Sequence, residues 1–368
     1  MLKYKKILAL SLIPQYFIVQ FISFYPDVIE KVYSNNFYTY ISFFLRNISN
    51  KIPFALGDII YIFFGLYFIY WIVNNIKYPK KLIIEIFATI SILYFLFNIC
   101  WGINYYKISL NNQIENVIYS EEDLNEFTLK LIGKLNKLHL EISEEDSSKV
   151  SLPYDFKENS KIAIKNYEHL YKKIIGYDSV NDFMTKSLNL IYNFNNSNSK
   201  MNLKKSILSY PLTYMGFSGY LNPFTHEYNI NSFIPKNSKP MVISHEIAHE
   251  IGFSSEMEAN FIGYIALINS DNLYYQYFGH SFALIQCLNE LQKNNKKSYS
   301  FHLSSINKGI IKNYNEIYEF WSKYDNPFEP IFKNIYDKFL KVNKVRSGIK
   351  SYNKSLSLIL YYNKIYND

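Results

Sequence analysis

The chain has 368 residues, a formal net charge of +8 and an aromatic content of 18%, and this length allows one sizeable core or a membrane segment followed by one domain. The lysines are scattered, with no basic stripe interleaved with glycine and aromatic residues, which argues against a nucleic-acid-binding protein. The two cysteines, Cys100 and Cys287, lie so far apart that they predict neither a disulfide nor a metal knuckle.

Three apolar runs near the N-terminus predict transmembrane helices. They cover about residues 7–25, 53–73 and 82–101, and each is close to the roughly 20 residues that cross a bilayer. The first run could also be a signal peptide, but Pro14 and Gln15 interrupt it and no small-residue cleavage site follows. A three-helix membrane anchor is therefore favoured.

Lysine residues predict which side of the membrane these runs face. They stand before the first run and in the short loop between the second and third runs, at Lys3, Lys5, Lys6, Lys77, Lys80 and Lys81. Because short cytoplasmic loops carry an excess of lysine and arginine, both segments are expected in the cytoplasm. Three spans then place the loop 26–52 and the chain beyond about residue 104 outside the cytoplasm.

Polar and amphipathic features of the anchor carry further expectations. Asp58 and Glu85 lie near the ends of the second and third runs, where solvated carboxylates are expected more often than functional intramembrane ones. Residues 40–45 are expected to lie in the membrane interface as a short amphipathic helix.

Helical periodicity predominates beyond residue 106. Amphipathic helices are predicted over residues 121–142, with Ser120 as the N-cap, and over residues 161–175. Residues 207–234 carry glycine, proline and alternating apolar residues, which predict strands and turns. Further helices are predicted within 178–198 and at about 240–251, 256–268, 273–291, 312–324, 327–342 and 356–363.

The segment His245-Glu246-Ile247-Ala248-His249 is an HExxH motif, the zinc signature of metallopeptidases. At 100° per residue on a helix, His245 and His249 share one face and can bind one Zn²⁺. Glu246 can then reach a metal-bound water as general base. The pattern also arises by chance in roughly one chain in a hundred of this length, in which case the histidines are ordinary surface or capped residues.

Two features beside the motif argue against chance. Ile243, Ile247 and Ile251 form a stripe on the opposite face, so this helix is expected to pack into a core and turn both imidazoles toward a cleft. Gly252 is well placed to end the helix as a left-handed cap.

Acidic residues after Gly252 are the candidates for a third ligand. A metzincin would have His or Asp three residues after the glycine, but this position is Ser255. Glu256 and Glu258 remain, and Glu256 is favoured because Glu258 would form a capping box with Ser255. Asn260, one turn beyond Glu256, is expected to orient a ligating imidazole, as in gluzincins but with Asn in place of Asp.

A residue that stabilises the oxyanion is also required. His226, Tyr228 and His280 are candidates by residue type alone, and each is more often structural. Residues 219–231 are expected to form either a strand at the edge of the cleft, to which an extended substrate adds, or a core hairpin.

The chain resembles a bacterial membrane family catalogued as domain of unknown function 3810. The resemblance covers nearly the whole chain and rests on residues 53–54, 57–58, 101–106, 222–225, 227, 244–249, 256–261, 336–341 and 348–352. It implies a zincin-like domain related to the gluzincins, in the inner membrane of a bacterium and facing the periplasm. Position 226 departs from the family's usual small residue, so the resemblance assigns no role to His226.

Together these patterns predict a mainly α membrane protein. Residues 1–104 would form the anchor, and residues 105–368 a predominantly helical α+β zincin-like domain outside the cytoplasm. The expected function is zinc-dependent hydrolysis of a peptide or protein substrate, with Zn²⁺ on His245, His249 and Glu256. The alternative is a non-catalytic membrane scaffold or binding protein that keeps the zincin-like fold. The expected partners are the substrate and the lipid bilayer, with no nucleic acid.

Overall fold

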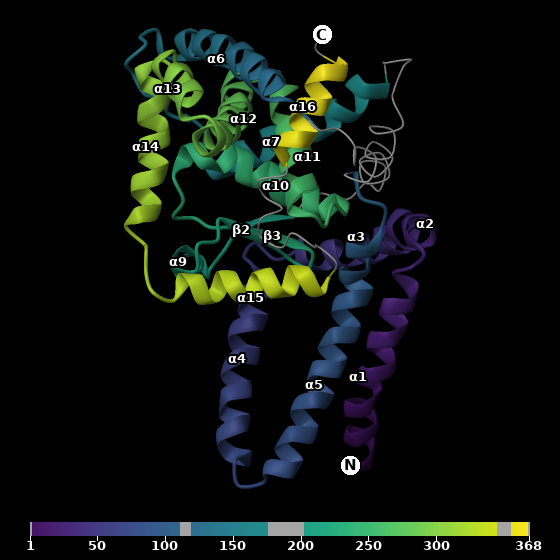
Figure 1. The fold of residues 1–368 in the computed structure, drawn as a ribbon. Coiled ribbons are helices and arrows are strands. Elements are labelled where there is room, and N and C mark those ends of the chain that lie inside the picture. Colours follow the sequence, from purple (N-terminus) through teal and green to yellow (C-terminus); the bar gives the residue numbers. More distant parts are fainter. Residues whose placement is uncertain (1, 111–118, 176–201, 344–354, 367–368) are drawn as a thin grey trace. The chain divides into compact units, whose positions relative to one another are not determined.

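The computed structural model describes residues 2–110, 119–175, 202–343 and 355–366, and these are mainly helical (Figure 1). The chain forms two compact units. The first unit contains residues 1–108, 193–208 and 221–229, and the second contains residues 109–192, 209–220 and 230–368. Each unit is described below by itself.

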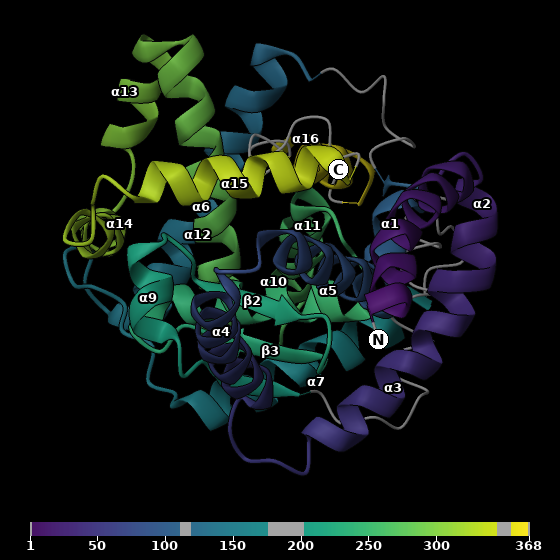
Figure 2. The same ribbon diagram turned by 90° about the horizontal axis from the view of Figure 1, so that it is seen from below.

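Three helices of the first unit are long and apolar enough to cross a membrane, as expected for a membrane protein. They are α1 (Leu2–Ile22), α4 (Leu56–Asn75) and α5 (Pro79–Cys100). Helix α1 lies along α5 in both views (Figures 1 and 2). Near their N-terminal ends, Lys5 Nζ lies 2.5 Å from Glu85 Oε1, so the two helices start at the same end of the bundle.

The segment between α1 and α4 is helical where the sequence predicted mainly a loop. It contains α2 (Pro26–Val28), the π-helix η1 (Ile29–Phe37) and α3 (Tyr38–Ser49). Aromatic burial accounts for the difference, because Tyr33 and Tyr38 join a buried cluster with Trp101, which lies just before the 3₁₀ helix η2 (Gly102–Tyr106). The rings of Tyr38 and Trp101 are 5.8 Å apart.

The two acidic residues of the anchor are buried, so the expectation that they are solvated was wrong. Asp58 has no exposed surface, and its Oδ2 accepts hydrogen bonds from Ser206 Oγ (2.8 Å) and the Ile207 amide (2.7 Å). Glu85 is buried against Lys5. Their partners come from distant parts of the sequence, which local composition cannot reveal.

A small three-stranded sheet has the order β1-β3-β2. Its strands are β1 (Leu203–Lys205), β2 (Gly219–Asn222) and β3 (Glu227–Ile230). The segment 207–234 is thus not extended throughout, because α9 (Ser209–Tyr214) precedes β2.

Glu227 of β3 holds the start of α4 within the first unit. Its carboxylate accepts hydrogen bonds from the Leu56 amide (3.0 Å) and the Gly57 amide (2.7 Å). These are amides of a helix N-terminus, which otherwise lack partners and attract negative charge. Gly57 packs so closely that an added Cβ would overlap the Asn222 amide and the Thr225 hydroxyl. Residues 57 and 222–227, widely separated in sequence, therefore form one structural joint.

The second unit consists mainly of helices around the buried helix α11. They are α6 (Glu121–Ser143), α7 (Phe156–Ile175), α10 (Lys239–Ile251), α11 (Glu256–Ile268), α12 (Leu273–Asn294), α13 (Lys296–Ser304), α14 (Lys308–Ser322), α15 (Glu329–Val342) and α16 (Ser355–Tyr366), with the 3₁₀ helix η4 (Lys236–Ser238) before α10. Ser120 caps α6 as predicted, and α13 was not predicted. The helix predicted within 178–198 lies outside the described residues.

Candidate metal centre

Helix α10 places the two histidines of the HExxH motif. Ile243, Ile247 and Ile251 are all buried, which confirms the predicted apolar stripe of this helix. Gly252 has a φ of 113° and ends the helix as the predicted left-handed cap. The chain reverses direction after this cap. The Phe253 amide donates a hydrogen bond to the Ala248 carbonyl (3.1 Å), and the chain then enters α11.

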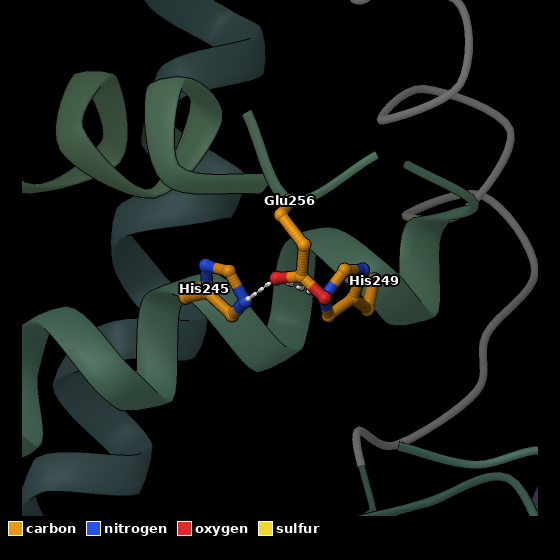
Figure 3. A group of neighbouring side chains, drawn as sticks. All are labelled: His245, His249 and Glu256. Atoms are coloured by element: carbon orange, nitrogen blue, oxygen red, sulfur yellow. Dashed lines mark ion pairs between the residues drawn. The ribbon is translucent and has the colours of Figure 1, made fainter. Parts of the chain in front are cut away.

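His245, His249 and Glu256 converge, with one potential ligand atom from each lying within 4.8 Å of the others (Figure 3). Glu256 Oε2 is 3.1 Å from His245 Nε2 and 3.5 Å from His249 Nε2. Ligand atoms about 2.0–2.1 Å from a tetrahedral Zn²⁺ are about 3.3 Å apart, so these two separations fit such an ion.

The Nδ1 atom of each imidazole has a hydrogen-bond partner of the kind that orients histidines in metal sites. His249 Nδ1 lies 2.6 Å from the Phe253 carbonyl oxygen, which can only accept, so Nδ1 carries the proton. His245 Nδ1 lies 2.8 Å from Asn260 Oδ1, the contact expected for Asn260. In the neutral imidazoles, the Nε2 lone pairs therefore point toward Glu256, which is the arrangement that metal binding requires.

Electrostatics of the site follow from burial and from these contacts. Burial alone would lower the pKa of His249, but the charge of Glu256 and the hydrogen bond to it raise that pKa to about 9. Burial alone would raise the pKa of Glu256, but the charge of His249 and hydrogen bonds from both imidazoles hold it well below its usual range. Burial raises the pKa of Glu246, while both imidazoles oppose this rise.

Glu258, the alternative third ligand, serves a different part of the chain. Its Oε1 accepts hydrogen bonds from the Leu110 amide (2.6 Å) and from Ser109 Oγ (2.8 Å). The expected capping box with Ser255 is wrong, because the Ser255 side chain makes no capping hydrogen bond at the start of α11. Glu258 therefore holds the entry of the chain into the second unit.

Tyr336 of α15 is a residue of the site that the sequence analysis missed. Its hydroxyl donates a hydrogen bond to Glu256 Oε1, whereas the ion pairs with both imidazoles use Oε2. Its ring packs against Phe217, with centroids 5.6 Å apart. The 80 residues between Tyr336 and Glu256 leave no local signal for this contact, although Tyr336 lies in one of the segments that carry the family resemblance.

A cavity of about 850 Å³ opens beside the cluster. Its polar end contains His245, Glu246, Asn260 and Tyr336. Its remaining walls are largely apolar and include Phe217, Met241, Phe278, Phe282, Ile285 and Leu288. This volume and lining are typical of sites that bind small molecules or side chains of larger ligands.

Residues 33–360 match the family described as protein of unknown function (DUF3810). The chain belongs to this DUF3810 family. No match was found among curated proteins or solved structures.

The remaining candidates of this DUF3810 chain do not line the cavity. His226 and Tyr228 belong to the first unit and are fully buried, and the His226 ring contacts Tyr38 and the Cys100 carbonyl oxygen. His280 is buried in α12, where burial lowers its pKa to about 3 and its ring nitrogens have no hydrogen-bond partner among the described residues. None of the three contributes to the polar end of the cavity. Cys100 and Cys287 are free thiols, as predicted.

Proposed function

We propose that this DUF3810 protein is a membrane-anchored, zinc-dependent peptidase with gluzincin-like chemistry. The observation that carries the proposal is the convergence of His245 Nε2, His249 Nε2 and the Glu256 carboxylate beside a cavity that His245 and Glu246 line. His245, His249 and Glu256 would hold the ion. Bound there, Zn²⁺ would act as a Lewis acid that lowers the pKa of a water and polarises a peptide carbonyl.

Glu246 is the proposed general base. It follows His245 directly on α10, lines the cavity, and is only 4% exposed. Its Oε2 has no hydrogen-bond partner among the described residues, so it has a free acceptor for a proton. Burial raises its pKa, which makes it a stronger base near neutral pH. Glu246 would take a proton from the attacking water and return it to the leaving amine as the C–N bond breaks.

Two further features would position the reacting groups. The Tyr336 hydroxyl donates a hydrogen bond to Glu256 Oε1, which would orient the carboxylate toward the imidazoles, and the Tyr336 side chain lines the cavity. Gly219, the first residue of the edge strand β2, also lines the cavity. An extended peptide could pair with this strand while its side chain enters the apolar part of the cavity.

The proposed location is outside the cytoplasm. The contact between Lys5 and Glu85 joins the beginnings of α1 and α5, and the lysine-rich turn between α4 and α5 also precedes α5. Both lysine clusters thus belong to one end of the helices, which is the end expected in the cytoplasm. The second unit starts at Ser109, after the opposite end of α5. In a bacterium it would then face the periplasm.

Hydrolysis by the full-length protein in proteoliposomes tests the proposal. An unfolded protein substrate is incubated with the zinc-loaded wild type, and new N-termini are identified by mass spectrometry. The Glu246→Gln variant should lose at least about 100-fold in rate, the usual range for removing a general base. Glu126→Gln, on the exposed face of α6, is the matched control and should keep the rate. A zinc-loaded wild type that cleaves nothing would favour a non-catalytic scaffold.

A further inference from the structure

Helix α15 carries an apolar stripe whose residues are exposed within the part of the chain that the structure describes. At 100° per residue the stripe residues fall within an arc of about 80°. They are between 37% and 64% exposed. The stripe consists of Phe328 at the N-cap, Ile331, Ile335, Phe339 and Val342.

The other sides of α15 are either buried or charged. Tyr336 and Leu340 face the interior of the second unit, where Tyr336 bonds Glu256 and Leu340 is fully buried. Lys338 borders the apolar stripe, and Lys341 lies further around the helix in a pair with Asp337. A helix with an exposed apolar stripe and a lysine at its border is typical of segments that lie in the plane of a membrane interface.

Exposed aromatic residues also occur in a segment that is joined to the start of α15. The Asn326 side chain donates a hydrogen bond to the Tyr214 carbonyl (2.8 Å), which joins the end of α9 to the start of α15. Within the same unit, Tyr210 is 58% exposed and Phe233 is 51% exposed, with ring centroids 6.2 Å apart. Tyrosine is enriched where proteins meet the headgroup region of a bilayer.

We infer that α15 docks in the headgroup–acyl boundary of the bilayer through this stripe. The bilayer is the expected binding partner of the stripe, because three helices of the first unit are long and apolar enough to cross a membrane. They tether the second unit to a lipid surface, so the effective concentration of that surface is high and even a short helix can stay docked. Lys338 beside the stripe favours anionic headgroups. This inference does not depend on the proposed hydrolysis.

A fluorescent label that reports its surroundings tests the docking. Ile335→Cys is made in the full-length chain with Cys100→Ser, labelled with an environment-sensitive dye, and placed in nanodiscs of phosphatidylethanolamine and phosphatidylglycerol. Cys287 is buried and stays in place. Asn334→Cys is the matched control, because Asn334 is the exposed neighbour that lies 100° around the helix.

Docking predicts a blue-shifted emission at position 335 and its quenching by lipids that carry a nitroxide near the headgroup end of the acyl chain. Both effects should be weaker at position 334, and the pair Phe328→Ser and Ile331→Ser should reduce them at position 335. Equal quenching at positions 334 and 335 would overturn the inference. A blue shift at position 335 that persists in lipid-free amphipol, together with a dimer, would assign the stripe to a second copy and would also overturn it.

Discussion

His245 and Asn260 are linked through the ring nitrogen that faces away from the candidate metal site, with Nδ1 2.8 Å from Asn260 Oδ1. Asn260 follows Glu256 by one helical turn on α11, so one helix supplies both the carboxylate and the group that orients the imidazole. The bond holds the His245 Nε2 atom toward Glu256 Oε2, from which it is 3.1 Å distant.

Replacing Asn260 with alanine should weaken zinc binding without unfolding the protein. Groups that hold a ligating histidine typically contribute about 10–100-fold to metal affinity, because they fix the tautomer and the ring orientation. Competition with a chromogenic chelator measures this affinity in the full-length protein. Asn269→Ala, at the end of the same helix, is the control and should bind zinc as the wild type does. An unchanged affinity for Asn260→Ala would remove Asn260 from the site.

The metal-free protein should lose stability as the pH rises from about 6.5 to about 9. The pKa of His249 is raised from 6.5 to about 9, so its contribution is complete below pH 6.5 and is lost through pH 9. The lowered pKa of Glu256 adds a contribution that is present above pH 4.5 and lost as the pH falls further. Thermal unfolding in detergent with a chelator, recorded between about pH 5 and about pH 9, measures how the stability changes with pH.

Glu256→Gln provides the reference for this trend, because it removes the charge that raises the pKa of His249. Its melting temperature should fall less between neutral and alkaline pH than that of the metal-free wild type. Identical pH profiles for the two proteins would show that the pair does not form in solution.

Gly57→Ala should destabilise the first unit, whereas Gly65→Ala on the same helix should not. A Cβ at position 57 would overlap Asn222 and Thr225, whereas a Cβ at position 65 has open space around it. Overpacking of a tight contact costs about 1–3 kcal/mol, and alanine is otherwise the better helix former. Thermal unfolding of the two variants in the same detergent compares them directly. A Gly57→Ala protein as stable as Gly65→Ala would contradict the observed joint.

Tyr336→Phe should lower zinc affinity and slow hydrolysis while leaving the fold intact. Without the hydroxyl, Glu256 Oε1 loses the donor that orients the carboxylate, a loss of about 10-fold or more in metal affinity for a group of this kind. Tyr324→Phe is a suitable control, because Tyr324 packs on the ring of Tyr214 outside the cavity. If the two variants bind zinc equally well, Tyr336 has no part in holding Glu256.

Much of the second unit could be predicted from local sequence, because its helices are set by periodicity and caps. The helix over 256–268, the left-handed cap at Gly252 and the contact between Asn260 and His245 all depend on residues within about 20 positions of one another. The spacing of the motif also determined which side chains share a face of α10.

The rest could not be predicted, because it depends on contacts between distant segments. Tyr336 reaches Glu256 across 80 residues, and Glu227 binds amides of α4 across 170. Asp58 appeared solvated for the same reason, since Ser206 and Ile207 that surround its carboxylate lie about 150 residues away. Residue type alone made His226 and His280 candidates, and the structure buries both outside the cavity.

Metal content of the purified full-length protein tests the central claim most directly. After exposure to Zn²⁺ and removal of the excess, elemental analysis should find about one zinc per chain in the wild type and in Glu246→Gln, because Glu246 is not among the proposed ligands. His249→Ala should lose this zinc while remaining folded by circular dichroism. A folded wild type that retains no zinc, or a His249→Ala variant that retains as much as the wild type, would contradict the account.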